Sequence, residues 1–172
     1  MDPVATLYLD IDGVVNFFGS RTQHRKHSGL SYQRRGAAVA YHPQLGNHPF
    51  EMNWSAELLK TLSELEGLEI ALLSTWNDSS PALFRTLGWS TDRVLAPVRR
   101  PGTLSEENKF DELVKDQELN PRPFVWVDDT ATVLASRLEL EVARLVITPN
   151  DDLGLTRFEL DSIVKFVEDL RN

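Results

Sequence analysis

The sequence contains no cysteine, which excludes several kinds of chemistry from the outset. Without thiols there is no disulfide framework, no thiolate nucleophile and no zinc or iron–sulfur site built on sulfur. Any metal ion must be held by oxygen or imidazole ligands. Apolar runs long enough to span a bilayer are also absent, as is the basic and then apolar segment of a secretory signal. We therefore expect a cytoplasmic protein that does not associate with a membrane.

Acidic residues are missing from one long stretch, between Asn16 and Phe50, although the whole chain carries a net charge of −8. That stretch holds five basic residues and is therefore +5, which leaves 13 basic against 26 acidic residues elsewhere. A basic segment beside an acidic remainder suits a phosphorylated substrate, because positive charge attracts phosphate. The alternative is an ordinary solvated loop. The basic residues and histidines of the stretch are Arg21, Arg25, Lys26, Arg34 and Arg35, and His24, His27, His42 and His48.

The length of 172 residues, 41% of them apolar, is enough for one domain with a well-buried core. No low-complexity tract or internal repeat divides the chain. We therefore predict a single domain over residues 1–172, with an insert at about 17–53. Inside the insert, Ala37–Tyr41 and Phe50–Trp54 lie on either side of Pro43, a pattern that predicts a hairpin.

Short apolar runs alternate with segments of helical periodicity along the chain. Repeated units of this kind form a parallel sheet covered on both faces, so the predicted fold class is α/β, a Rossmann-like doubly wound parallel sheet. The predicted strands are Leu7–Leu9, Leu68–Leu73, Val94–Ala96, Phe124–Val127 and Leu145–Ile147. The predicted helices are one capped by Ser55, then Pro81–Leu87, Ser105–Gln117 and Thr130–Leu138, and a last one opened by a capping box of Thr156 and Glu159, with Phe158, Ile163, Phe166, Val167 and Leu170 facing the core.

Two carboxylates, Asp10 and Asp12, follow directly after the first predicted strand. The run Leu7–Leu9 shows no polar alternation, which indicates a strand buried on both faces, and Gly13 permits a sharp turn behind it. Ligands of open α/β sheets bind at this carboxyl edge of the strands. The alternative is a turn in which Asp merely caps the strand. We interpret the pair as part of a reaction site.

Two hydroxyl groups, those of Ser74 and Thr75, follow the second predicted strand. A hydroxyl at this edge can hold a phosphoryl oxygen without competing for a metal ion, although such residues are often only caps. Asn77 is a further polar candidate for binding substrate. Trp76 is better explained by packing, with a platform for substrate as the alternative.

A second pair of acids, Asp128 and Asp129, follows the strand Phe124–Val127 and comes to the same edge as the first pair. Four converging carboxylates repel one another unless a cation neutralises them, and oxygen ligands without cysteine indicate Mg²⁺ rather than zinc. Capping of the next helix would explain one of the new acids and leave the other unexplained. The sequence therefore predicts a magnesium site at Asp10, Asp12, Asp128 and Asp129.

Lys109 lies on a predicted helix, where a lysine is normally solvated. The order of the motifs along the chain indicates a functional role for Lys109 instead. The series Asp10-x-Asp12-Gly13-Val14, Ser74-Thr75, Lys109 and Asp128-Asp129 resembles the haloacid dehalogenase (HAD) superfamily, over nearly the whole chain. A narrower similarity, to small domains of this type found in RNA-repair polyproteins, rests on Ser74–Asn77, Trp126–Asp129, and Thr148-Pro149 leading to Gly154–Thr156.

The resemblance implies a HAD-like fold and a phosphatase that works through an aspartyl-phosphate. In that family pattern Asp10 attacks phosphorus, while Asp12 protonates the leaving oxygen and then activates water. Asp12 argues for a phosphatase within the superfamily, because an alkoxide leaving group must be protonated. Ser74 and Lys109 would steady the phosphoryl group, and whether Ser74 or Thr75 supplies the hydroxyl stays open.

The resemblance also implies how the metal and the substrate bind. Mg²⁺ would be held by the Asp10 carboxylate, the main-chain carbonyl of Asp12 and Asp128, with Asp129 in support. The insert occupies the place where the family carries a flap or cap, and its small size favours a nucleotide, a polynucleotide end or another large phosphorylated substrate. The predicted substrate-binding residues are Thr75, Asn77, Arg21, Arg25, Lys26, Arg34 and Arg35.

Two other function classes stay open at this point. One is a catalytically inert module that binds nucleic acid through the basic insert, although the isoelectric point near 5.0 argues against it. The other is a protein-interaction domain that has kept the scaffold and lost catalysis. The presence of each motif residue that the chemistry needs disfavours the second.

Overall fold

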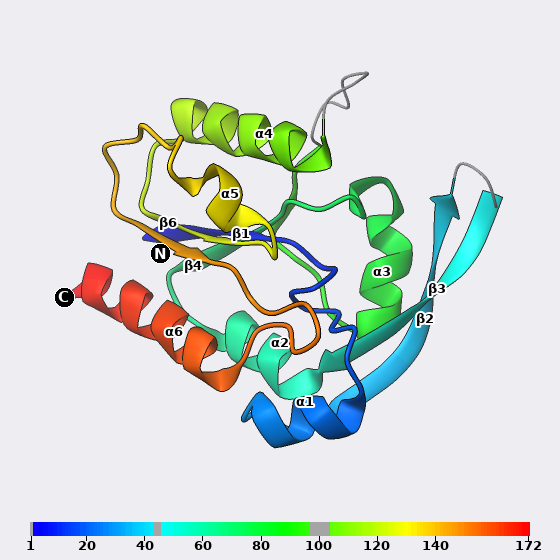
Figure 1. Cartoon of the computed structure of the whole chain (residues 1–172). Helices are drawn as coiled ribbons and strands as arrows, with labels where there is room; N and C mark the ends of the chain where they lie inside the picture. The colour runs from blue at the N-terminus through cyan, green and yellow to red at the C-terminus, as the bar shows by residue number, and fades with distance from the viewer. Residues whose placement is uncertain (1, 43–45, 97–103) are drawn as a thin grey trace.

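The computed structural model describes residues 2–42, 46–96 and 104–172. Its main sheet has five parallel strands in the order β5-β4-β1-β6-β7 (Figure 1), which confirms the Rossmann-like α/β fold. The strands are β1 (Ala5–Leu9), β4 (Leu68–Leu72), β5 (Arg93–Val94), β6 (Phe124–Val127) and β7 (Arg144–Ile147). The helices of this part are α2 (Ala56–Glu64), the short 3-10 helix η1 (Asn77–Ser79), α3 (Ser80–Leu87), α4 (Ser105–Leu119), α5 (Ala131–Ala135) and α6 (Arg157–Arg171).

Strand β1 occupies the middle of the sheet, and all five of its side chains are buried. This is the position that an unbroken apolar strand favours, since both of its faces are covered. In the sheet register, Leu9 lies beside Leu72 of β4 on one side and beside Val127 of β6 on the other. The three strands therefore end side by side, and the residues that follow them meet at one edge.

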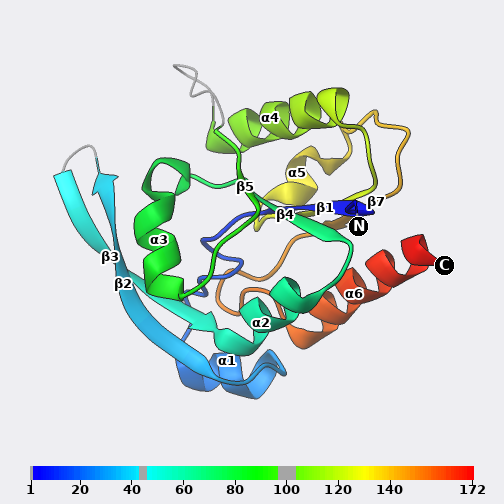
Figure 2. The same cartoon turned by 180° about the vertical axis from the view of Figure 1, so that it is seen from behind.

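Helices cover both faces of the sheet (Figures 1 and 2). On one face, Leu7 and Leu9 belong to an apolar core with the buried leucines of α2 and with Leu160 and Ile163 of α6. On the other face, a second core forms around Tyr8 under α4 and α5, with members that include Phe110, Leu113, Trp126, Ala131 and Leu134. A strand that alternates its side chains between two apolar layers accounts for the lack of polar alternation in the sequence.

The segment after β1 contains a helix, α1 (Arg21–His27), and an antiparallel hairpin of β2 (Gln33–His42) and β3 (Gly46–Ser55). The predicted hairpin is confirmed and is longer than expected, with pairing from Gln33 opposite Ser55 to His42 opposite Gly46. Its predicted turn at Pro43 lies outside the described residues. Sequence reasoning missed α1, whose one start signal is Ser20, the N-cap that accepts a hydrogen bond from Gln23 N–H.

Several predicted boundaries need correction. The strand expected at Val94–Ala96 is the two-residue edge strand β5, and the helix expected over Thr130–Leu138 ends at Ala135. Phe158 is 80% exposed, so its predicted core position is wrong. The buried stripe of α6 runs through Leu160, Ile163 and Val167, and a residue two positions before that stripe points to the opposite side of a helix.

The ends of two helices follow the predicted capping. Ser55 accepts a hydrogen bond from Leu58 N–H at the start of α2, and Glu159 accepts one from Thr156 N–H at the start of α6. Among the residues that the structure describes, no helix combines the length and the apolar character required to cross a membrane.

Candidate active site

Three acidic side chains gather at the edge where the central strands end. Asp10 follows β1 and Asp128 follows β6, and both are buried, while Asp129 is half-buried. One carboxylate oxygen from each lies within 4.8 Å of the others. Gly13 makes room for this arrangement, because it has a φ of +71° and a Cβ there would lie 2.6 Å from Oδ2 of Asp129.

Lys109 of α4 places its ammonium group between two of these acids. Its Nζ lies 2.5 Å from Oδ2 of Asp10 and 2.8 Å from Oδ2 of Asp128, and the lysine side chain is only 8% exposed. Burial alone would lower the pKa of Lys109, but attraction to the two carboxylates outweighs burial and raises this pKa. Burial raises the pKa of Asp10, and the ammonium group opposes that change. The lysine is therefore a charged partner of the cluster.

The carboxylates of Asp10 and Asp128 are also held by uncharged donors. Oδ1 of Asp10 accepts a hydrogen bond from Ile11 N–H at 2.7 Å, and the nearby Ser74 hydroxyl lowers the pKa of the same carboxyl group. Oδ1 of Asp128 accepts from the N–H and the hydroxyl of Thr130, at 2.9 and 2.5 Å. Asp128 thus caps the turn before α5 and contacts Lys109 with its other oxygen.

The three polar residues predicted after β4 have different surroundings. Ser74 is buried against Asp10, whereas Thr75 is exposed. Asn77 is half-buried and its side-chain oxygen accepts a hydrogen bond from Asp78 N–H. The structure therefore brings Ser74 to the acid cluster and leaves Thr75 exposed.

Asp12 is half-buried and stands outside the three-acid cluster. Its two oxygens accept hydrogen bonds from Asn16 Nδ2 at 2.8 Å and from the indole Nε1 of Trp76 at 2.9 Å. Sequence reasoning missed both contacts. It treated Trp76 as packing, and it had no signal for Asn16 beyond the spacing of four residues from Asp12.

These motifs fit one known family. A family model described as the HAD domain in Swiss Army Knife RNA repair proteins matches residues 6–160. The chain belongs to this HAD family. Its membership confirms the resemblance read from the motifs and supports a HAD-type hydrolase, with which the acid cluster is compatible. Searches of curated proteins and of solved structures gave no match.

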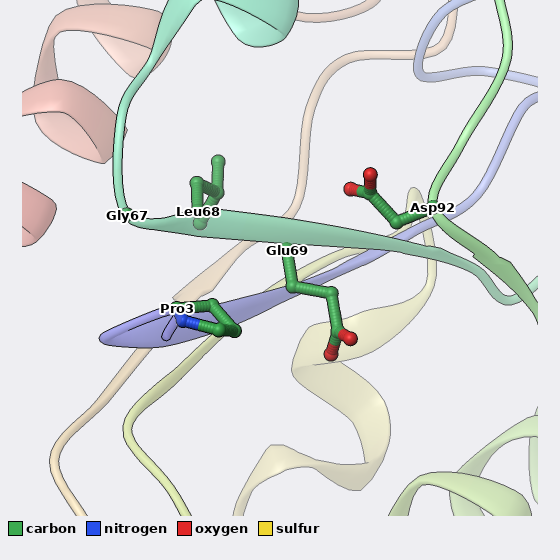
Figure 3. A pocket seen from close by; sticks show the side chains of 5 residues that line it. All are labelled: Pro3, Gly67, Leu68, Glu69 and Asp92. Atoms are coloured by element: carbon green, nitrogen blue, oxygen red, sulfur yellow. The ribbon is translucent and has the colours of Figure 1, made fainter. Parts of the chain in front are cut away.

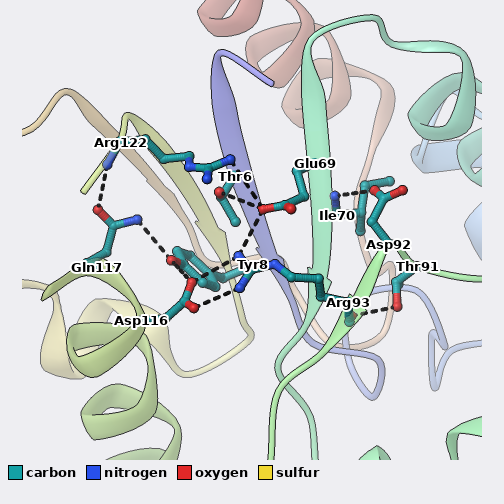
Figure 4. A network of polar contacts seen from close by, with 10 residues as sticks. All are labelled: Thr6, Tyr8, Glu69, Ile70, Thr91, Asp92, Arg93, Asp116, Gln117 and Arg122. Carbon is teal, nitrogen blue, oxygen red and sulfur yellow. Dashed lines mark hydrogen bonds and ion pairs between the residues drawn. The ribbon is translucent and has the colours of Figure 1, made fainter. Parts of the chain in front are cut away.

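The HAD domain fixes α4, which carries Lys109, through a second buried polar network (Figure 4). Asp116 accepts a hydrogen bond from the Tyr8 hydroxyl at 2.6 Å and is paired with Arg93 of β5, whose Nη1 lies 2.7 Å away. Gln117 donates to the same Tyr8 hydroxyl at 2.9 Å. Because Tyr8 lies two residues before Asp10, the network ties α4 to the strand that carries the cluster.

The predicted basic residues lie apart from the acid cluster of the HAD domain. Arg21, Arg25 and Lys26 are exposed on α1, which lies on the opposite side of the molecule from α4 (Figures 1 and 2). Arg34 is exposed on β2, and Arg35 pairs with Glu51 across the hairpin. Within the described residues, none of the five contacts the acid cluster.

A pocket of about 280 Å³ lies at the far edge of the sheet, where the strands begin (Figure 3). Its lining residues are Pro3, Gly67, Leu68, Glu69 and Asp92. Both of its carboxylates have protein partners, since Asp92 accepts a hydrogen bond from Ile70 N–H and Glu69 pairs with Arg93. This pocket is therefore separate from the acid cluster.

The acid cluster offers the donors that a hard divalent cation prefers. It consists of carboxylates alone, and when all three are ionised the Lys109 ammonium leaves two negative charges in excess. Burial, followed by the neighbouring charge of Asp128, raises the pKa of Asp129. A bound cation would oppose that shift and favour the ionised carboxylate. HAD proteins typically use a metal ion, and the residues present here fit one.

Proposed function

We propose that this HAD domain is a Mg²⁺-dependent phosphatase that hydrolyses a phosphomonoester through an aspartyl-phosphate on Asp10. The observation that carries the proposal is the burial of Asp10 beside Asp128, Lys109 and Ser74 at the carboxyl edge of the sheet. A carboxylate in a shielded site, next to a fixed cation, is suited to attack phosphorus once the negative charge of the phosphate is neutralised.

The reaction is proposed in two balanced steps. An oxygen of Asp10 forms a bond to phosphorus as the bond from phosphorus to the ester oxygen breaks. The leaving ester oxygen takes a proton from Asp12. Asp12, now ionised, takes a proton from water, whose oxygen bonds to phosphorus and releases Asp10 and phosphate. Two easier displacements replace one difficult displacement.

Lys109 and Ser74 steady the group in transfer. The Lys109 ammonium supplies positive charge where the phosphoryl oxygens gain negative charge, and the Ser74 hydroxyl can donate a hydrogen bond to one of them. Asp10, Asp128 and Asp129, with the main-chain carbonyl of Asp12, would hold Mg²⁺, which screens the phosphate from the carboxylates. Lys109 and Ser74 both lie next to Asp10, so neither needs a rearrangement of the fold to act.

The proposed substrate is a nucleotide, a polynucleotide end or another large phosphorylated molecule. The matching family is described as a domain of RNA repair proteins, which supports a phosphate at an RNA end. The basic residues of the insert support a polyanion. Because α1 is remote from the cluster, we assign Arg21, Arg25 and Lys26 to the body of a long substrate and Thr75 and Asn77, which follow β4, to its reacting end.

Metal-dependent turnover tests the proposal. Purified protein should hydrolyse an aryl phosphate and a 3′- or 5′-phosphorylated oligonucleotide in Mg²⁺ and should lose this activity in excess chelator. Asp128→Asn should lower kcat by about 100-fold or more, since it weakens both the metal site and the contact to Lys109. Asp161→Asn changes an exposed acid on α6 in the same way and should keep full activity.

Two outcomes would contradict the proposal in different ways. Activity that persists unchanged in excess chelator would exclude the metal. Binding of the oligonucleotide without turnover of either ester, in the presence of Mg²⁺, would favour the inert nucleic-acid-binding module instead.

A further inference from the structure

The Asp12 carboxylate has a donor on each of its oxygens. Asn16 Nδ2 donates to Oδ1 at 2.8 Å, and the Trp76 indole Nε1 donates to Oδ2 at 2.9 Å. The donors come from different parts of the chain, one from the turn after β1 and the other from the turn after β4. Two donors on separate oxygens fix both the position and the plane of a carboxylate.

Both donors are themselves fixed by the β2–β3 hairpin. Oδ1 of Asn16 accepts a hydrogen bond from Asn53 N–H of β3 at 2.8 Å, and Asn16 is only 4% exposed. The Trp76 ring is 5% exposed and meets the ring of Phe50, also on β3, edge to face at a centroid distance of 5.8 Å. Neither donor can change its orientation without disturbing the hairpin.

We propose that Trp76 and Asn16 are positioning residues that hold Asp12 for proton transfer to the leaving oxygen. The inference rests on the proposed phosphatase function. Neither an indole nor an amide side chain exchanges a proton readily at neutral pH, so both act through Asp12. A proton donor displaced by about 1 Å can lose about 100-fold in rate, and a carboxylate held from two sides avoids that loss.

The proposal assigns a second task to the insert. Phe50 and Asn53 lie on the same strand of the hairpin and support the two donors from one side. A substrate that presses on the hairpin would therefore act on the orientation of Asp12 through these contacts. In this arrangement the hairpin is part of the catalytic apparatus.

The consequence is a dependence on the leaving group. A p-nitrophenolate leaves with little need of a proton, whereas an alkoxide needs one from Asp12. Trp76→Phe keeps an aromatic ring beside Phe50 and removes the indole N–H together with part of the buried ring. At saturating Mg²⁺, this variant should lose about tenfold or more in kcat on an alkyl phosphate and less than about threefold on p-nitrophenyl phosphate, with KM little changed.

Trp89→Phe is the matched control. The indole of Trp89 donates to Ser63 Oγ at 2.6 Å, away from the acids, so the same substitution there removes an indole hydrogen bond at a more exposed position. It should leave kcat unchanged on both esters. A second variant, Asn16→Asp, keeps the acceptor for Asn53 N–H and replaces the donor to Asp12 with a carboxylate. It should show the same selective loss on the alkyl ester as Trp76→Phe.

A double-mutant cycle and one spectroscopic signal separate positioning from general destabilisation. In an Asp12→Asn background, Trp76→Phe should have no further effect on the alkyl ester, because the proton donor is already absent. The indole N–H resonance of Trp76, assigned by its loss in Trp76→Phe, should shift in Asp12→Ala, and the Trp89 resonance should not.

Equal losses on the two esters in an active protein, or an effect of Trp76→Phe that persists in Asp12→Asn, would overturn the positioning role alone. An unshifted Trp76 resonance would overturn the contact itself. A wild-type protein that hydrolyses neither ester would overturn the phosphatase proposal, and the positioning role with it.

Discussion

The positive charge of Lys109 offsets the repulsion among the three clustered carboxylates. Its ammonium group lies within 2.8 Å of both Asp10 and Asp128, and no more than 8% of any of these three side chains is exposed. Removal of one partner from a buried ion pair commonly costs about 3–5 kcal/mol, since it leaves a charge without compensation. The lysine therefore stabilises the cluster before any substrate or metal binds, and in the proposed phosphatase the same charge is available to the phosphoryl group.

His24 is a second buried ionisable residue, and it lies in the insert. Its ring is 2% exposed and stacks on Phe17 with centroids 3.8 Å apart. Burial lowers its pKa to about 4. The Gln33 side-chain amide lies 3.3 Å from Nδ1, a contact in which the amide donates and the ring must accept, as only a neutral ring can. His24 is therefore a core histidine.

The lowered pKa of His24 predicts a loss of stability in acid. The unfolded chain binds a proton near pH 6.5, whereas the folded chain binds it only near pH 4, so the stabilisation is complete above pH 6.5 and is lost as the pH falls. We expect His24 to account for about 2–3 kcal/mol of the free energy of unfolding lost between pH 7 and pH 4.5. Urea denaturation at the two pH values measures this change in the free energy of unfolding.

The control for this prediction is His27→Gln, which changes an exposed histidine on the same helix. Carboxylates also titrate over this range, so the test is the difference between variants. His24→Gln should show a smaller loss between pH 7 and pH 4.5 than His27→Gln. The same loss in both variants would mean that His24 is not buried in its neutral form.

At the residue scale, the sequence predicts chemistry where it is local and fails where it depends on distant partners. Asp10 and Asp128 were found because each directly follows an apolar strand. Nothing near Lys109 distinguishes it from Lys115 on the same helix, which is exposed. The partners of Lys109 are 99 and 19 residues away, and only the order of the family motifs identified it. The hydrogen bond from Trp76 to Asp12 spans 64 residues and left no such pattern.

Helix α4 was predictable from the sequence, but the charged residues on its buried face were not. Its existence follows from periodicity, but its buried face also carries charged and polar residues, namely Lys109, Asp116 and Gln117. Lys109 and Asp116 are seven residues apart, which is about two turns, so they lie on one side of the helix. The pairing of Asp116 with Arg93 and Tyr8 fixes the rotation of α4, and this rotation brings Lys109 to Asp10. Sequence rules that place charges in solvent cannot foresee such a face.

Helix α1 exposes three basic residues that can be tested as a binding element. If its exposed basic residues bind the body of a polyanionic substrate, the triple variant Arg21→Gln, Arg25→Gln, Lys26→Gln should raise KM for a phosphorylated oligonucleotide and spare turnover of an aryl phosphate. Each lost phosphate contact should also flatten the slope of log affinity against log salt by about 0.7. Steady-state kinetics and binding at several salt concentrations measure both effects.

The matched control removes the same charge from other surfaces. Lys60, Lys115 and Lys165 are exposed on α2, α4 and α6, each beside an acidic residue of its own helix. Their triple change to Gln should leave KM and the salt slope close to those of the unaltered protein. Equal effects in the two triple variants would show that only net charge matters and would remove the case for α1 as a binding element.

At the scale of the whole molecule, the sheet and its edge were predictable because they depend on repeated local patterns. Apolar strands alternating with amphipathic helices indicate a parallel sheet, and parallel strands bring their carboxyl ends to one edge. The insert was predicted less well, since its hairpin follows from two short runs on either side of a turn residue whereas its position depends on packing. Thr86 of α3 donates to the Ala37 carbonyl of β2, and Asn53 contacts Asn16, and neither contact has a local signature.

The proposed mechanism requires that Asp10 becomes phosphorylated during turnover, and one measurement tests this step directly. The protein is mixed with a phosphomonoester and Mg²⁺, quenched in acid during turnover, digested and analysed by mass spectrometry. The proposed mechanism predicts a phosphoryl group on the peptide that contains Asp10, sensitive to hydroxylamine as an acyl phosphate is, and absent from Asp10→Asn, which should also be inactive. A phosphoryl group on Ser74, or normal turnover by Asp10→Asn, would contradict it.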